Sequence, residues 1–306
     1  MKYDTIKISK NENGHKYFIV FSTKGGRNLK YIFLNLKRFD IPKELGGVNG
    51  LAPVKEWGEY IVRNTQDSLK KYHADEAEFA MFFPEAHLIG AVGALHEGSP
   101  VKVGCQSVFR DDTSVGGNFG AFTSNRTANS VKAMGCEAAI IGHCEERRDK
   151  MGILQETGVH NADVVNSLLN KEIQCAVKAG LKVLYCIGET AEEQPEWQNT
   201  LKKQLEIGLQ GINASKVVIA YEPVWAIGPG KIPPDRDYIQ MVGRFVKEVT
   251  GGAPVVYGGG LKKDNAEMLA SIPEIDGGLI ALTRFSGDIG FYPDEYLEII
   301  KNYMGK

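Results

Sequence analysis

Eight short apolar segments recur along the chain, and this repetition is the feature that most restricts its fold. The segments are apolar throughout instead of alternating with polar residues, which is the pattern of strands buried on both faces. They are YIFLNL (31–36), EFAMFF (78–83), VKVGCQSV (101–108), AAIIG (138–142), KVLYCI (182–187), KVVIAY (216–221), PVVYGG (254–259) and GGLIAL (277–282).

Stretches with helical periodicity lie between most of these segments, for example at 57–72, 127–135, 162–180 and 236–251. Eight strands alternating with helices over roughly 250 residues are typical of an α/β fold of the (β/α)8 TIM barrel type. An open, doubly wound sheet is the alternative, but no GxGxxG motif follows the first strand. We therefore expect one barrel domain over residues 31–306.

The first 30 residues do not follow this alternation. Residues 4–23, DTIKISKNENGHKYFIVFST, read as two strands around an Asn-Gly turn. An Asn-Gly pair between two such runs is a strong hairpin signal. We expect residues 1–30 to form an N-terminal β-hairpin extension that precedes the barrel.

The composition argues against several classes of partner. The chain of 306 residues is 43% hydrophobic and 24% charged, with a net charge of −2. It has no excess of basic residues for nucleic acid or an anionic membrane, and no apolar run near the roughly 18 residues of a spanning helix. The start lacks a hydrophobic signal core. Five cysteines without CxxC spacing favour reduced thiols, so we expect a cytoplasmic protein.

Polar side chains fall at the ends of the predicted strands. Asn35 and Lys37 end the first strand, His143 ends the fourth and Glu222 ends the sixth. In a barrel these ends meet at one rim, where active sites lie. Each residue alone has a structural explanation, but a carboxylate at the end of a buried strand must be compensated or have its pKa raised. Together they predict a functional site at this rim of the barrel.

The segment AYEPVWAIGPGK (220–231) follows from the sixth strand and ends in GPGK. A phosphate-binding P-loop needs glycine six residues before the lysine and Ser or Thr after it. Those positions hold Trp225 and Ile232, so this segment is not a P-loop.

Several motifs together resemble the triosephosphate isomerase family over nearly the whole barrel. AYEPVWAIGPGK is similar to the family's AYEPVWAIGTGK, and IIGHCEERR contains a version of its GHSERR. VLYCIGET, VVYGGG, VKVGCQSVF, GAFTSN and NLK provide further matches. The resemblance implies a cofactor-independent aldose–ketose isomerase that uses neither metal nor organic cofactor and interconverts dihydroxyacetone phosphate and glyceraldehyde 3-phosphate through an enediolate.

Site residues follow from the resemblance by position. Glu222 is similar to the family's base, and His143 to the neutral imidazole that polarises the carbonyl. Lys37 and Asn35 resemble the pair that stabilises the enediolate oxygens, and Glu145 the glutamate behind them. PVWAIGPGK resembles the flexible lid, which would carry the backbone N–H of Gly228 to the substrate phosphate, with Pro223 and residues 228–230 as hinges.

The phosphate side departs from the family pattern. Two glycines after the eighth strand are replaced by Ala281 and Leu282, and Gly260 stands where the family has serine. We expect Gly259, Gly260 and Leu282 to face the phosphate through backbone N–H groups, and Arg284 to add a charged donor or to form an ion pair with a residue such as Asp288. GHCEERR also holds one residue too many, so either Arg147 or Arg148 fills the family's arginine position.

These departures leave alternatives open. The chain could be an isomerase of the same mechanism for another small ketose phosphate, such as a tetrulose phosphate. It could also be a non-catalytic barrel that binds a phosphorylated metabolite, or a Schiff-base aldolase built on Lys37. VGGNFGAFTSN resembles the family's protruding loop, which would place Thr123 beside a neighbouring active site. We therefore expect a homodimer.

Overall fold

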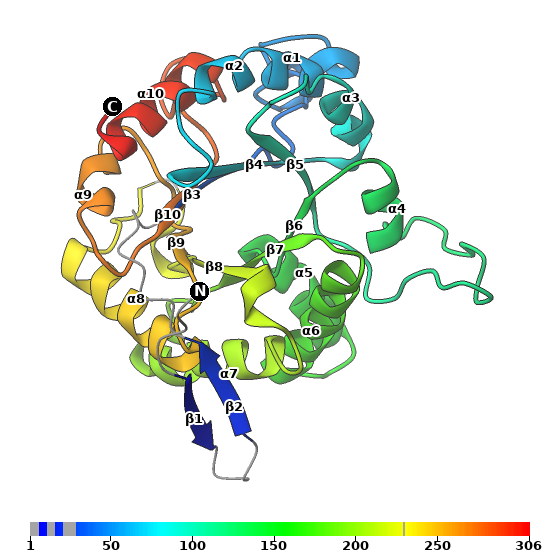
Figure 1. Ribbon diagram of the computed structural model, residues 1–306, viewed down its shortest axis with the longest axis vertical. Coiled ribbons are helices and arrows are strands. Elements are labelled where there is room, and N and C mark those ends of the chain that lie inside the picture. Colours follow the sequence, from blue (N-terminus) through cyan, green and yellow to red (C-terminus); the bar gives the residue numbers. More distant parts are fainter. Residues whose placement is uncertain (1–5, 11–15, 21–28, 229) are drawn as a thin grey trace.

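The computed structural model describes residues 6–10, 16–20, 29–228 and 230–306. Its main feature is a closed barrel of eight parallel strands in the order β10-β3-β4-β5-β6-β7-β8-β9 (Figure 1). Because β10 pairs with both β3 and β9, the open-sheet alternative is wrong and the predicted barrel is confirmed. The strands are β3 (Lys30–Asn35), β4 (Ala77–Phe83), β5 (Val101–Gln106), β6 (Ala138–Ile141), β7 (Lys182–Ile187), β8 (Val217–Tyr221), β9 (Val255–Tyr257) and β10 (Gly277–Ile280).

Apolar side chains fill both sides of the barrel wall, which explains why the strands are apolar throughout. One buried cluster lies inside the barrel and the other packs between the strands and the surrounding helices. The inner cluster consists of Phe33, Ala80, Phe82, Ala138, Ile140, Leu184, Cys186, Val218, Ala220, Val256 and Leu279. The outer cluster includes Ile32, Leu34, Phe83, Val183, Ile219 and Tyr221 from the same strands.

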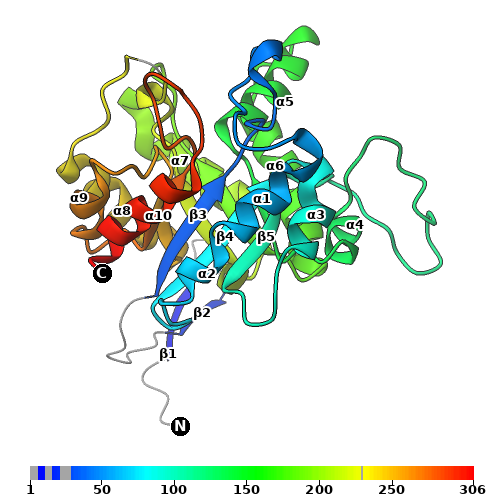
Figure 2. The same cartoon turned by 90° about the horizontal axis from the view of Figure 1, so that it is seen from above.

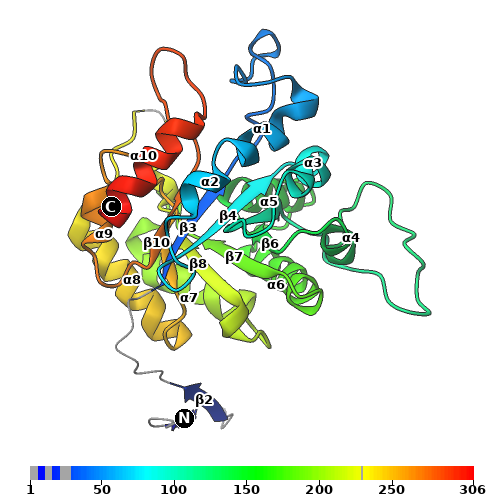
Figure 3. The same cartoon turned by 45° about the horizontal axis from the view of Figure 1, so that its top comes forward.

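The helices surround the strands (Figure 3). They are α1 (Trp57–Arg63), α2 (Gln66–Leu69), α3 (Leu88–Gly93), α4 (Ala128–Ala133), α5 (Cys144–Glu156), α6 (Ala162–Lys178), α7 (Trp197–Gly208), α8 (Arg236–Thr250), α9 (Ala266–Ala270) and α10 (Pro293–Met304). None of the helices in these described ranges is long and apolar enough to cross a membrane.

The helix expected over 57–72 is broken into α1 and α2. The Thr65 hydroxyl donates to the carbonyl oxygens of Ile61 and Val62, at 2.7 and 3.2 Å. Threonine bonded to its own preceding turn competes with the helical backbone pattern. By contrast, α8 ends as predicted, because Gly251 has the left-handed φ of 70° that suits a helix C-terminus.

The N-terminal hairpin is present as a separate two-stranded antiparallel sheet, β1 (Ile6–Lys10) with β2 (Lys16–Val20). Ile6 pairs with Val20 and Lys10 with Lys16. The Asn-Gly turn lies outside the described residues. The division of the chain into residues 1–30 and 31–306 remains a prediction.

The loop between β5 and α4 projects away from the barrel as a long finger (Figures 2 and 3). Val115 and Phe119, in the middle of this loop, are 109% and 91% exposed. Apolar side chains held this far from the barrel lack any intramolecular cover, which is a common mark of an interaction site.

Candidate active site

Glu222 follows β8 directly and its side chain is buried, with 2% exposed. Glycines on both neighbouring strand ends make room for it. A Cβ on Gly188 would lie 1.8 Å from the Glu222 carbonyl oxygen, and one on Gly258 would lie 2.7 Å from its Cγ. Larger residues at these two positions would push the glutamate from its place.

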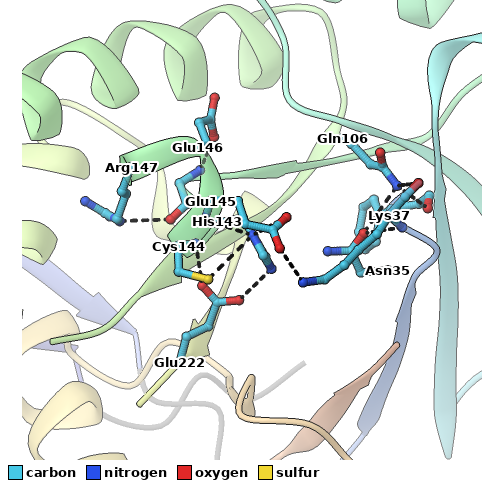
Figure 4. A network of polar contacts seen from close by, with 11 residues as sticks. Asn35, Lys37, Gln106, His143, Cys144, Glu145, Glu146, Arg147 and Glu222 are labelled. Carbon is cyan, nitrogen blue, oxygen red and sulfur yellow. Dashed lines mark hydrogen bonds and ion pairs between the residues drawn. The ribbon is translucent and has the colours of Figure 1, made fainter. Parts of the chain in front are cut away.

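The Glu222 carboxylate faces His143 and the first turn of α5 (Figure 4). Its Oε1 lies 3.2 Å from His143 Nε2, and its Oε2 accepts a 2.9 Å hydrogen bond from the Cys144 N–H. Burial raises the pKa of Glu222 above its ordinary value, against the opposing effect of His143 and the Cys144 N–H. A carboxyl with a raised pKa is a stronger base once ionised.

His143 is the N-cap of α5, and this position determines which ring nitrogen carries the proton. Its Nδ1 accepts the N–H of Glu145 at 3.2 Å. A neutral imidazole that accepts at Nδ1 carries its proton at Nε2. The Nε2–H is therefore the donor that faces Glu222 and the barrel mouth.

Lys37 and Asn35 are fixed together at the end of β3. Lys37 has a φ of 40°, which is uncommon for a residue with a side chain and is characteristic of functional sites. Its N–H donates to Asn35 Oδ1 at 3.1 Å, and its Nζ lies 2.7 Å from Glu145 Oε1. Burial disfavours the Glu145 carboxylate, but the Lys37 bond outweighs it, so the pKa of Glu145 is lowered.

Gln106, at the end of β5, supports this pair and was not singled out from the sequence. Its Nε2 lies 3.3 Å from Asn35 Oδ1 and 3.1 Å from the carbonyl oxygens of Lys37 and Phe82. Gln106 lies near the end of a predicted strand, as Asn35 does, and this position is the feature of the sequence that could have identified it as a site residue.

Arg147 fills the inward arginine position that the sequence left undecided. Its guanidinium donates to the carbonyl oxygens of Gly142 and Cys186, to Asn166 Oδ1 and to the Tyr185 hydroxyl, at 2.8 to 3.2 Å. Arg148 is exposed. Arg147 therefore anchors α5 to β6 and β7. Of the two arginines in GHCEERR, it is the one that points inward.

Glu146 and Glu172 form a carboxylate pair next to the site, with Glu172 buried and Glu146 partly buried. Glu146 accepts from the Gly142 N–H at 2.6 Å and from the Ser107 hydroxyl at 2.5 Å. Lys150 bridges the pair, at 3.1 Å from Glu146 and 2.9 Å from Glu172. Burial, and then the charge of Glu146, raise the pKa of Glu172 from 4.5 to about 8.

This shift predicts a pH dependence of stability. Between the unfolded and folded pKa values of Glu172, the folded state holds a proton that the unfolded state has lost. The free energy of unfolding therefore falls as pH rises from about 4.5 to about 8. Glu172→Gln cannot titrate, so the wild type should lose stability relative to this variant between about pH 4.5 and about pH 8 in urea unfolding. Parallel curves for the two proteins would contradict the prediction.

The start of the predicted lid is anchored by Glu189, another residue that the sequence did not single out. Glu189 is fully buried, and its Oε1 accepts from Trp225 Nε1 at 2.8 Å and from the Tyr221 hydroxyl at 2.9 Å. Gly228 has a φ of 125°, which favours glycine at this place. Pro229 lies outside the described residues.

The predicted phosphate side offers backbone donors. Within the described part of the chain, the N–H groups of Gly259, Gly260 and Leu282 have no backbone or side-chain acceptor. Gly259 is tightly enclosed, because a Cβ there would lie 2.4 Å from the Tyr257 hydroxyl and 3.1 Å from Pro223 Cδ. Gly260 has a φ of 103°. Neighbouring N–H groups of this kind can bind an anion.

Arg284 forms an ion pair with Glu295 and not with Asp288, the partner suggested from the sequence. Its guanidinium lies 2.9 and 2.5 Å from Glu295 Oε1 and stacks over the Tyr292 ring at 3.9 Å. Asp288 instead pairs with Lys43 and Tyr292. Arg284 is thus linked to the first turn of α10.

A cavity of about 320 Å³ opens beside the residues at the ends of β3, β5 and β6. Five predicted residues are joined by direct contacts, namely Asn35, Lys37, His143, Glu145 and Glu222. All of these except Glu222 line the cavity, together with Gln106, Ser107, Glu146 and Lys150. Gly228, Gly259, Gly260, Leu282 and Arg284 are not among the residues that line it.

Comparison with known proteins agrees with this geometry. The family model described as triosephosphate isomerase matches residues 55–302, which include His143, Glu145 and Glu222. The chain belongs to the triosephosphate isomerase family. The triosephosphate isomerase of Chlorobium luteolum is 36% identical over 219 residues, which cover 68% of this chain and 79% of that protein. The triosephosphate isomerase of Rhodopirellula baltica is 31% identical over 260 residues, covering 80% of this chain and 91% of that protein.

A solved triosephosphate isomerase has the same fold. The crystal structure of the enzyme from Bartonella henselae matches with a TM-score of 0.66 and 25% identity, covering 90% of this chain and 98% of that one. The family model does not include Asn35 and Lys37, which precede its matched range. Their assignment within the triosephosphate isomerase family rests on the NLK motif and on their contacts with Glu145 and Gln106.

Proposed function

We propose that this protein is a cofactor-independent triose-phosphate isomerase that interconverts dihydroxyacetone phosphate and glyceraldehyde 3-phosphate. The observation that carries the proposal is the buried Glu222 carboxylate, whose Oε1 lies 3.2 Å from His143 Nε2. Proton transfer between two adjacent carbons needs one positioned base and a donor aimed at the oxygen where charge develops.

The reaction can be followed through the residues. Glu222 removes a proton from the carbon next to the carbonyl. The Nε2–H of His143 and the Lys37 ammonium stabilise the negative charge that forms on the oxygens. Asn35 holds the Lys37 backbone through the 3.1 Å bond and lies at the same rim. Glu222 then returns the proton to the neighbouring carbon. The hydroxyl proton of the substrate passes to the former carbonyl oxygen, and His143 Nε2 is the group positioned to relay it.

The phosphate of the substrate would bind at the unpaired N–H groups of Gly259, Gly260 and Leu282, and closure of the lid would add that of Gly228. Closure excludes water, which protects the enediolate from losing its phosphate. The ion pair of Lys37 with Glu145 disfavours a Schiff-base aldolase, because an ammonium held by a carboxylate has no free lone pair to attack a carbonyl.

The direct test is an assay of the purified protein against a panel of three- to five-carbon aldose and ketose phosphates. We expect the triose phosphates to have the highest kcat/KM. Trapping with borohydride should give no adduct, since an enediolate enzyme forms no imine. Binding without turnover of any member would instead favour a phosphometabolite-binding barrel.

We further propose that the protein is a cytoplasmic homodimer. The projecting loop between β5 and α4 supports this, because Val115 and Phe119 in this loop are exposed and Thr123 follows them. An apolar finger is stabilised when a second copy covers it. Light scattering at micromolar concentration should give the mass of a dimer; a monomeric mass would overturn the claim.

A second candidate, an isomerase for a substrate with one more carbon, is favoured by the phosphate-side departures. Ala281 and Leu282 restrict close approach to their turn, and Arg284 follows two residues later, where it could meet a phosphate held farther out. It would then share its guanidinium between Glu295 and the phosphate.

Arg284→Ala should therefore weaken binding of the phosphorylated substrate at least tenfold, the loss of a charge-assisted bond. Glu295→Gln is the matched control, because it weakens the ion pair but keeps the guanidinium, and it should bind substrate at least as tightly as wild type. If Arg284→Ala binds substrate within twofold of wild type, the arginine only anchors α10. The candidate with the longer substrate is then refuted, and the triose-phosphate isomerase remains.

A further inference from the structure

Cys144 brings a thiol to the catalytic centre that the proposed reaction does not use. It is the first residue of α5, directly after His143, and is partly buried. Its Sγ lies 3.8 Å from His143 Nδ1, while its backbone N–H holds Glu222 (Figure 4). One possible ligand atom from each of His143, Cys144 and Glu222 lies within 4.8 Å of the other two.

From this cluster we infer a binding site for a divalent cation of the zinc class, with the His143 imidazole, the Cys144 thiolate and the Glu222 carboxylate as ligands. Imidazole, thiolate and carboxylate are the ligands that Zn²⁺ uses in proteins, and three of them with one open position form a tetrahedral site. Ligand atoms around such an ion lie roughly 3.3–3.6 Å apart, given bonds of about 2.0–2.3 Å. A single ring nitrogen of His143 would bind the ion. One ligand atom from each of the three residues lies within 4.8 Å of the other two, so these side chains would draw closer together to reach that spacing.

Coordination replaces the proton of the Cys144 thiol, because the charge of a divalent ion stabilises the thiolate. Magnesium or calcium would not serve, since they prefer oxygen ligands.

The consequence for function rests on the proposed isomerase reaction. Glu222 and His143 cannot act as base and electrophile while they coordinate an ion. Zinc should therefore inhibit reversibly and in competition with substrate, and a chelator should restore activity.

The test is a titration of the purified full chain with Co²⁺, followed by the cobalt–thiolate absorption in the near ultraviolet, and with Zn²⁺ in the isomerase assay. Wild type should show the absorption at one equivalent, and zinc should displace the cobalt. Cys144→Ser should lose the absorption, and zinc should inhibit its remaining activity at least tenfold less well. Cys175→Ser, at a partly buried thiol on α6 outside the cluster, should behave as wild type in both measurements.

The two proposals fail separately. A protein that shows the cobalt–thiolate absorption but isomerises no sugar phosphate would refute the proposed reaction and leave the metal site standing. An active isomerase without the absorption, or a Cys144→Ser variant that zinc inhibits as strongly as wild type, would refute the metal site alone.

Discussion

Replacing Glu222 with glutamine should lower isomerase turnover by about 10²–10⁴-fold, the contribution of a single general base. The amide has nearly the shape of the carboxylate, and its oxygen can still accept the Cys144 N–H that now donates at 2.9 Å. It cannot accept the proton of the substrate. Steady-state kinetics with both triose phosphates would measure the loss, and a drop of less than about tenfold would remove Glu222 as the base.

The folded state should tolerate the Glu222→Gln change. Burial raises the pKa of Glu222, so its ionised form is held in the folded protein at a cost in stability, and a neutral amide avoids that cost. The amide NH2 then faces the His143 Nε2–H, which offsets part of this gain. The variant should therefore unfold at a urea concentration close to that of wild type. Glu298→Gln is the matched control, since Glu298 lies on α10 and pairs with Lys263 at the surface. It should change neither turnover nor stability appreciably.

The barrel could be predicted because its signal is repeated eight times. Strands buried on both faces must be apolar throughout, so each run was visible without knowing its neighbours. The break between α1 and α2 was not visible, because it depends on the rotamer with which Thr65 bonds Ile61 and Val62. Threonine in a helical pattern reads the same whether its hydroxyl points to water or to its own backbone.

The contacts of the candidate site could be predicted partly from strand ends and partly from family motifs. Periodicity places Asn35, His143 and Glu222 at one rim, but it does not reveal the residues that hold the neighbouring side chains in place. Gln106 and Glu189 act through contacts with residues distant in the sequence, at Asn35 and at Trp225. Arg284 shows the same limit, since its partner Glu295 lies beyond a turn whose shape depends on the Arg284 and Gly290 backbones.

Lys37→Met should raise KM and lower kcat together, with kcat/KM reduced by about 10- to 100-fold or more, the range for loss of one charge-assisted bond. The ammonium is positioned by two unusual features, a φ of 40° and a 2.7 Å bond to Glu145. Methionine keeps the length and apolar stem of the side chain, so the change removes the charge with little loss of packing. It also leaves Glu145 without its cation, which adds repulsion toward a phosphorylated substrate.

Lys102→Met is the matched control, because Lys102 pairs with Glu78 near the start of β5, at the opposite end from Gln106. Its kinetics should match wild type. Unchanged kinetics in Lys37→Met would place Lys37 outside the site and leave the enediolate charge to His143 alone.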